Sequence, residues 1–77
     1  MKKNKFVGQI QLKGKSMSRQ EYTSWIKKSV KFLKENEIKH KRAYRISFNI
    51  FFRKLEDMNL FLLIFGEQFE VINDQYI

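Results

Sequence analysis

The sequence has no cysteine and no proline, and only three glycines in 77 residues. Without cysteine, disulfides and thiolate metal sites are excluded, and a reducing cytoplasm is the compartment that the composition favours. Three isolated glycines do not form a glycine-rich phosphate loop. The longest apolar run, Leu60–Phe65, is too short to cross a bilayer. We therefore expect a cytoplasmic protein with no membrane partner.

The length of the chain leaves room for one domain with one small core. Its apolar fraction is 43%, and eight phenylalanines, three tyrosines and one tryptophan supply the aromatic content. Such a composition favours folding, because disordered segments lack the apolar surface that offsets the entropy of ordering. We predict a single domain over residues 1–77. Domains of this size often gain stability from a second subunit when disulfides and metals are missing.

Basic residues are missing from the end of the chain, since none follows Lys54. Residues 1–54 carry sixteen bases and three acids, a net charge of +13, whereas residues 55–77 carry five acids and no base, a net charge of −5. An asymmetry of this kind does not determine a fold, but it creates a directional field that selects partners. We expect the basic part of the chain to bind an anionic surface.

Residues that could carry catalysis are scarce. The single histidine, His40, lies among lysines and arginines without a carboxylate or nucleophile beside it. Its two interpretations are a phosphate contact and a solvated loop position. The adjacent acids Glu56 and Asp57 would not converge on one substrate atom from a turn, and the remaining carboxylates are dispersed. We expect no enzymatic activity, no metal and no cofactor.

The clearest local signal is a helix start at Ser18. Ser18 and Glu21 have the spacing of a capping box, in which each side chain accepts a hydrogen bond from the other residue's backbone N–H. We predict a helix from Arg19 to about Glu35, with Asn36 as a left-handed stop. The apolar stripe of this helix contains Tyr22, Trp25, Ile26, Val30 and Leu33, and its opposite face contains Ser24, Lys27, Lys28, Lys31 and Lys34.

Two segments alternate between apolar and polar residues with the period of a strand. The first covers residues 6–12, before the helix. The second covers residues 44–53, which are rich in aromatic and β-branched types, and a basic connection at 39–42 joins it to the helix. The face of this second strand that carries Tyr44, Ile46, Phe48, Ile50 and Phe52 is expected to meet the helix.

Residues 55–65 fit two structures. A strand is favoured by the apolar run Leu60–Phe65, whereas a helical stripe is marked by Leu55, Met58, Leu62 and Phe65. We favour the strand, preceded by a turn at 56–57. A hairpin turn of type I′ or II′ is then expected at Gly66-Glu67, followed by a return strand at Phe69–Ile72.

These elements predict an α+β fold of order β-α-β-β-β, with an antiparallel four-stranded sheet, its first strand at one edge, and one amphipathic helix packed on one face. A strand that is apolar on both sides needs a cover on both. A second copy of the chain is the simplest cover, so we favour a homodimer, although curling of the sheet or folding back of Tyr76-Ile77 would also serve. The expected interface residues are Phe51, Phe61, Leu63 and Phe65.

The basic residues form two groups that could contact phosphates. One is a ridge on the helix, formed by Lys27, Lys31 and Lys34. The other is the connector after the helix, residues 39–45. If the two groups are adjacent, they would bind several phosphates and release counterions, while the strand at 45–53 would add polar contacts. Lysines on the solvent face of a helix also have a purely structural interpretation. The expected contacts are Lys27, Lys31, Lys34, Lys39, Lys41, Arg42, Arg45 and Arg53.

We therefore predict a small, basic, non-enzymatic nucleic-acid-binding protein. The alternative is an inhibitor or adaptor, of the kind that phages and mobile elements encode, that binds an acidic or nucleic-acid-binding host protein. The acidic end modestly favours this alternative, because a nucleic-acid binder gains nothing from a net charge of −5 there. Adsorption to a membrane is disfavoured, since the apolar face of the helix is committed to the sheet.

Overall fold

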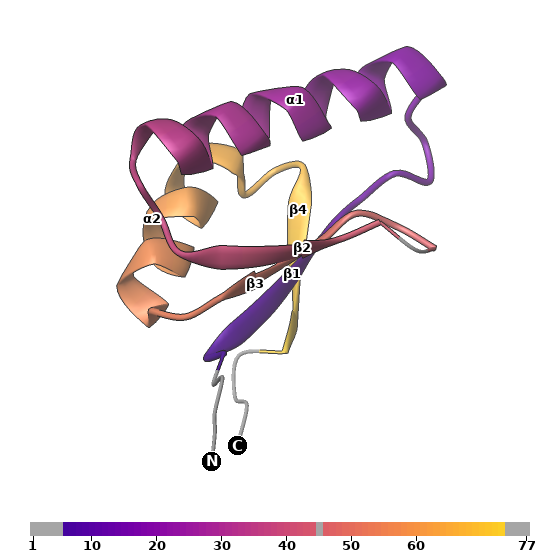
Figure 1. Ribbon diagram of the computed structural model, residues 1–77. Helices are drawn as coiled ribbons and strands as arrows, with labels where there is room; N and C mark the ends of the chain where they lie inside the picture. Colours follow the sequence, from indigo (N-terminus) through magenta and orange to yellow (C-terminus); the bar gives the residue numbers. More distant parts are fainter. Residues whose placement is uncertain (1–5, 45, 74–77) are drawn as a thin grey trace.

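Two helices lie on one face of a four-stranded sheet in this computed structural model, which describes residues 6–44 and 46–73 (Figure 1). The elements along the chain are β1 (Gly8–Leu12), α1 (Arg19–Glu35), β2 (His40–Ala43), β3 (Asn49–Phe52), α2 (Leu55–Phe65) and β4 (Phe69–Asn73). The α+β class and the four-stranded antiparallel sheet are confirmed. The element order is β-α-β-β-α-β, with one helix more than predicted.

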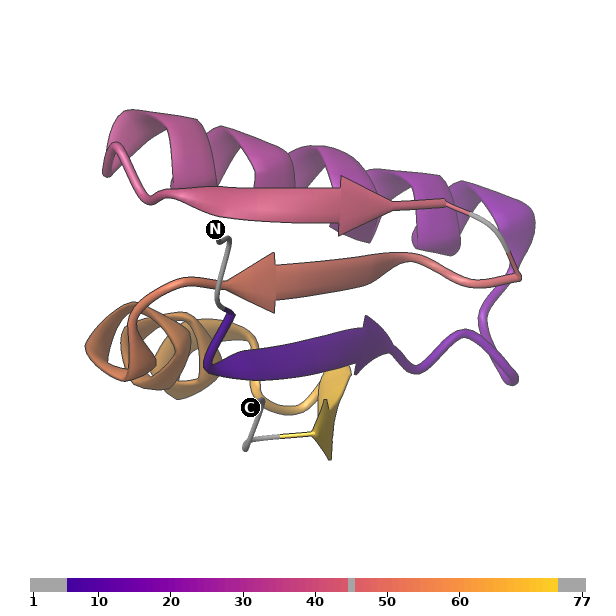
Figure 2. The same cartoon turned by 60° about the horizontal axis from the view of Figure 1, so that its bottom comes forward.

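The strands are arranged in the order β2-β3-β1-β4, and every neighbouring pair is antiparallel. This is the split β-α-β, or ferredoxin-like, connectivity, which by itself implies no function. β1 lies between β3 and β4, so the prediction that the first strand forms an edge was wrong. The edge strands are β2 and β4 (Figure 2).

Apolar and polar residues alternate between the two faces of the sheet in β1, as predicted. Gly8, Ile10 and Leu12 are buried against the helices, whereas Gln9 and Gln11 lie half-buried on the other face. The same division holds in β3, where Ile50 and Phe52 are buried. The predicted return strand is also confirmed, but β4 pairs with β1 and not with residues 60–65.

Helix α1 begins and ends where the sequence predicts. The Ser18 Oγ accepts from the Glu21 N–H at 3.1 Å, and the Ser18 N–H donates to the Glu21 carboxylate at 3.0 Å, which completes the capping box. Asn36 is not left-handed, however; the positive φ of 52° is at Glu37. The N–H of Glu37 donates to the Lys34 carbonyl and the N–H of Ile38 to the Leu33 carbonyl. This pattern is the Schellman motif, in which the left-handed residue comes one position after the cap.

The segment from 39 to 53 differs from its prediction. The basic connection is partly strand β2, and the single long strand is broken by a turn between β2 and β3. Phe48, Ile50 and Phe52 point into the core as predicted, but Tyr44 is 57% exposed and Ile46 fully exposed. Alternation indicates which face a residue takes, and it does not show where a chain reverses.

Residues 55–65 form a helix, so the preference for a strand was wrong. Met58, Phe61 and Phe65 are buried along one side of α2, at the spacings of a helix. Gly66 ends α2 with φ −62°, and it does not form the predicted hairpin turn. A Cβ at Gly66 would meet the Leu62 carbonyl oxygen. Because no strand here is apolar on both sides, the reason for a sheet-covering homodimer does not hold.

The core is dominated by phenylalanine rings that meet around Phe61. Its ring lies 4.6 Å from that of Phe65, 5.0 Å from Phe69 and 5.6 Å from Phe52, between ring centroids. Phe32 of α1 joins the same cluster at 5.9 Å. Rings at such separations contribute beyond their burial, by about 0.5–1.5 kcal/mol for a pair. The cluster thus binds both helices to the inner face of the sheet.

Candidate nucleic-acid interface

The predicted ridge on α1 faces solvent. Leu33 and Ser29 are fully buried on the inner side of the helix, and the Ser29 hydroxyl donates to the Ile26 carbonyl at 2.9 Å. Lys27, Lys31 and Lys34 therefore lie on the exposed side, at spacings of four and three residues that form one row. Lys31 also makes an ion pair of 4.0 Å with Glu35, between two largely exposed side chains.

Strand β2 divides its cations between the two faces of the sheet. Lys41 pairs with Phe51 and therefore lies on the face without helices, whereas Arg42 pairs with the buried Ile50 and lies on the helix side. His40 is half-buried within β2, so the solvated-loop interpretation was wrong. Its Nδ1 lies 2.8 Å from the Ile38 carbonyl oxygen.

Helix α1 runs along β2 (Figure 2). Side chains of the two elements line a groove. Its volume is about 470 Å³, and we call it the helix–strand groove. It brings together four of the predicted contacts, three ammonium groups from α1 and one guanidinium from β2. The half-buried side chains of Ile26 and Val30 give it an apolar floor, while its lysines are exposed at the rim. The lining residues are Ile26, Lys27, Val30, Lys31, Lys34, Glu35, Arg42 and Tyr44.

The face of the sheet opposite the helices, the open sheet face, carries a row of hydrogen-bonded polar side chains. The side-chain amide of Gln9 donates to the Oδ1 of Asn49 at 2.9 Å. The Gln11 amide donates to the Ser47 hydroxyl at 2.5 Å. Phe51 lies beside them, 5.8 Å from the ring of Phe6. These contacts fix a flat polar surface with aromatic rings at one end.

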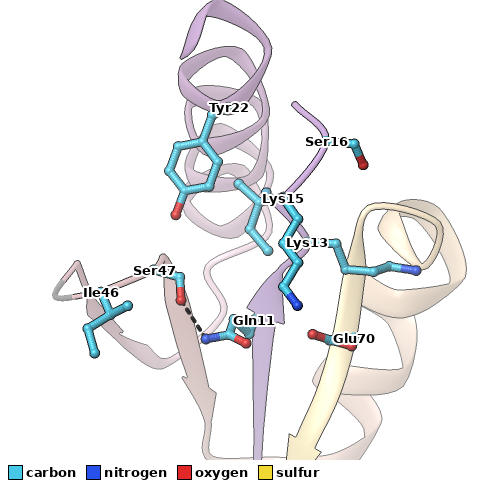
Figure 3. Close-up of a pocket in the computed structure, with 10 residues that line it drawn as sticks. Gln11, Lys13, Lys15, Ser16, Tyr22, Ile46, Ser47 and Glu70 are labelled. Carbon is cyan, nitrogen blue, oxygen red and sulfur yellow. Dashed lines mark hydrogen bonds between the residues drawn. The ribbon is translucent and has the colours of Figure 1, made fainter. Parts of the chain in front are cut away.

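A second hollow of about 560 Å³, the sheet-end pocket, lies where β1 ends (Figure 3). Lys13 and Lys15 line it, and neither makes an ion pair with a described carboxylate. Figure 3 shows Tyr22 reaching into the pocket from α1, with Ser47 on one side and Glu70 on the other. These residues could not be grouped from the sequence, because the pocket combines the end of β1, helix α1, the turn before β3 and strand β4.

The structure brings four of the predicted contact residues together and places the other described ones elsewhere. Lys27, Lys31, Lys34 and Arg42 line the helix–strand groove. Lys39 is exposed before β2, Lys41 lies on the open sheet face, and the Arg53 guanidinium lies 5.1 Å from the centre of the Phe6 ring. Arg45 lies outside the described residues.

The four predicted interface residues also separate. Phe61 and Phe65 are 0% and 7% exposed within the core, so an interface role for these two was wrong. They had been expected on one face of a strand, whereas in a helix the same positions share the buried side. Leu63 is 83% exposed on α2, and Phe51 is half-buried on the open sheet face.

Within residues 6–44 and 46–73, no three histidine, cysteine, aspartate or glutamate side chains come close enough to hold a metal ion. In the same part of the chain, neither helix has the length and apolarity needed to cross a membrane. No protein family, curated protein or solved structure matches this chain. What this protein binds is therefore inferred from the geometry and charge of its surfaces.

Proposed function

We propose that this protein binds nucleic acid, with phosphate groups held in the helix–strand groove. The observation that carries the proposal is the convergence of Lys27, Lys31, Lys34 and Arg42 on one groove from two separate elements. Among the described residues that line the same groove, only Glu35 carries a carboxylate. Four cations against one acid leave a net positive surface, which is the electrostatic footprint of phosphate binding.

The position of β2 favours a binding path that continues past the groove. Arg42 on the helix side and Lys41 on the open sheet face are consecutive residues of an edge strand. A nucleic-acid strand that crosses this edge would pass from cations to the amides of Gln9 and Asn49, which have donors and acceptors suited to base edges. The groove would supply affinity in this arrangement, and the amide row would supply any preference for sequence. The absence of cysteine favours a reducing cytoplasm as the setting.

A matched pair of charge reversals on α1 tests the proposal. The groove variant is Lys27→Glu with Lys31→Glu. The control variant is Arg19→Glu with Lys28→Glu, which reverses the same number of charges on the same helix outside the groove. Affinity for labelled single-stranded and duplex oligonucleotides is measured by fluorescence anisotropy across a salt series, and circular dichroism verifies that each variant is folded.

For the wild type we expect log K to fall with log salt with a slope of about −3 to −4 if four phosphates are contacted. The groove variant should lose about tenfold or more in affinity and reduce that slope by about 2, because two contacts are removed. The control variant should lose about threefold or less, through long-range charge alone. Equal losses in the two variants would mean that the groove is not the site, and no binding by the wild type to any oligonucleotide at low salt would overturn the function.

A further inference from the structure

The solvent side of α2 is apolar. Leu60, Leu63 and Ile64 are 41%, 83% and 54% exposed and follow one another at spacings of three and one. Leu63 and Ile64 follow Leu60 by three and four residues, so both are its neighbours on the helix surface. Leu60 and Leu63 lie opposite the buried Met58 and Phe61, and Ile64 lies at the flank. Large exposed apolar groups that gather on one side of a helix indicate a contact surface.

Acidic residues stand at both ends of this apolar surface. Glu56 precedes Leu60 by one helical turn, and Glu67 follows Leu63 by four residues in the turn after α2. Both glutamates are exposed. We call the set Glu56, Leu60, Leu63, Ile64 and Glu67 the α2 stripe. A partner for it needs apolar side chains in the middle and cations at the margins.

The helix–strand groove has these features. Its floor contains Ile26 and Val30, and its rim contains Lys27, Lys31 and Lys34. At 1.5 Å per residue, the stripe is about 16 Å long, and the part of α1 that lines the groove, from Ile26 to Glu35, is about 14 Å long. The two surfaces therefore match in chemistry and approximately in length.

Within one molecule the stripe and the groove cannot meet. Figure 2 shows α1 along the β2 edge of the sheet, whereas α2 lies toward β1 and β4. The stripe also faces away from the core that α2 shares with α1, since Leu60 and Leu63 lie on the side of α2 opposite the buried rings. A contact between the two surfaces has to join different molecules.

We propose that the α2 stripe of one molecule docks into the helix–strand groove of a second copy, so that copies associate head to tail. A two-fold pairing of α2 with α2 is disfavoured, because antiparallel stripes would place Glu56 of one copy beside Glu67 of the other. The described part of the chain after Lys54 carries no cation to offset this repulsion. The head-to-tail contact instead places each glutamate near lysines.

This arrangement leaves a free stripe at one end and a free groove at the other, so association is open-ended unless it closes into a ring. It also places the stripe and nucleic acid in competition for the same groove. The inference rests on the shape and charge of the groove and does not require that nucleic acid bind there.

Two variants that each remove one half of the contact provide the test. Leu63→Glu places a charge in the centre of the α2 stripe, and Lys27→Glu with Lys31→Glu reverses the charge of the groove. All three side chains are exposed, so the substitutions leave the core unchanged. Leu55→Gln is the control for the stripe, since Leu55 is 48% exposed on α2 outside it. Mass is measured by sedimentation equilibrium over a concentration series, on nuclease-treated protein without absorbance from nucleic acid.

We expect the weight-average mass of the wild type and of Leu55→Gln to rise with concentration above that of two chains of 9.4 kDa. Each stripe or groove variant alone should remain a monomer. An equal mixture of the two should form a dimer and stop there, because one complete contact survives in the mixture. A monomeric wild type would overturn the inference. So would a groove variant that dimerises alone, since that result indicates pairing of α2 with α2.

The same variants separate this inference from the proposed function. Leu63→Glu leaves the groove intact and should bind oligonucleotides at least as tightly as the wild type. If it binds them normally while the wild type never associates, the proposed function stands and the docking inference fails. If the wild type associates but binds no oligonucleotide, the reverse holds.

Discussion

The two helices pack on the same sheet but differ in what stabilises them. α1 has 17 residues, a complete capping box and a Schellman motif, and it presents lysines to solvent. α2 has 11 residues, its N-cap residue Lys54 makes no side-chain cap bond, and it presents Leu60, Leu63 and Ile64 to solvent. An isolated helix of this length is marginal in water. α1 is therefore specified largely by its own sequence, whereas α2 depends on the phenylalanine cluster against which it packs.

The charges of the helices follow the same division. α1 lies in the basic part of the chain, and α2 lies in the acidic part, with Glu56 and Asp57 in its first turn. Acidic side chains in the first turn interact favourably with the helix dipole, so the acidic segment helps to stabilise α2. The comparison predicts that changes at the phenylalanine cluster affect stability strongly, and that changes at the caps affect it weakly.

Replacing Phe61 should have the largest effect, because it tests the dependence of α2 on the core. Phe61→Ala removes a ring that contacts four others and leaves a cavity between α2 and the sheet. We expect a loss of about 3–5 kcal/mol in the free energy of unfolding, measured by urea denaturation. The control Leu55→Ala, at a 48% exposed position of the same helix outside the α2 stripe, should change stability by less than about 1 kcal/mol. Similar losses in the two variants would mean that the cluster does not hold α2.

The dependence of α2 on tertiary contacts explains why the sequence did not predict it. Its apolar residues lie on both sides of the helix, so the 3.6-residue period is masked, and the run Leu60–Phe65 resembles a buried strand. In α1 the apolar residues and the lysines lie on separate faces, and the capping box at Ser18 marks where the helix begins. The capping box and the amphipathic spacing were enough to predict α1. α2 has no side-chain cap bond, and the apolar run Leu60–Phe65 outweighed its helical stripe in the prediction.

The site could be predicted only in part for a related reason. Helical spacing predicted that the lysines of α1 form one row. It did not predict that Arg42 lies beside them, because this depends on β2 running along the helix. The residues 39–53 gave no sign of the reversal between β2 and β3, because alternation continues through it. The sheet-end pocket could not be predicted, since Lys13, Tyr22 and Glu70 come together only through the sheet order.

Removing the Tyr22 hydroxyl should have the second largest effect on stability. It tests how far α1 depends on a contact outside the helix. That hydroxyl accepts the Phe48 N–H at 2.7 Å and ties α1 to the turn before β3. Tyr22→Phe leaves this N–H without its partner, which should cost about 1–3 kcal/mol in the free energy of unfolding. Tyr44→Phe is the control, because Tyr44 is 57% exposed. A loss in the control as large as that in Tyr22→Phe would argue against a role for this hydrogen bond.

Removing the cap of α1 should cost less. Ser18→Ala eliminates the bond from the Glu21 N–H to the Ser18 Oγ and should lower the free energy of unfolding by about 1 kcal/mol. Urea denaturation measures it, with Ser16→Ala as the control at an exposed serine outside the capping box. No difference between the two variants would show that the cap is dispensable and that α1, like α2, is held by packing.

Adding a cap to α2 is the smallest change and has the opposite sign. Lys54 already has the extended backbone of an N-cap, at φ −126° and ψ 134°, but makes no side-chain cap bond. Lys54→Ser supplies an oxygen for an unpaired backbone N–H in the first turn, so we expect a gain of about 0.5–1 kcal/mol in urea denaturation. Lys54→Ala, which removes the charge without adding an acceptor, is the control. If serine and alanine give equal stability, capping does not limit α2, and its weakness relative to α1 lies in its length and packing alone.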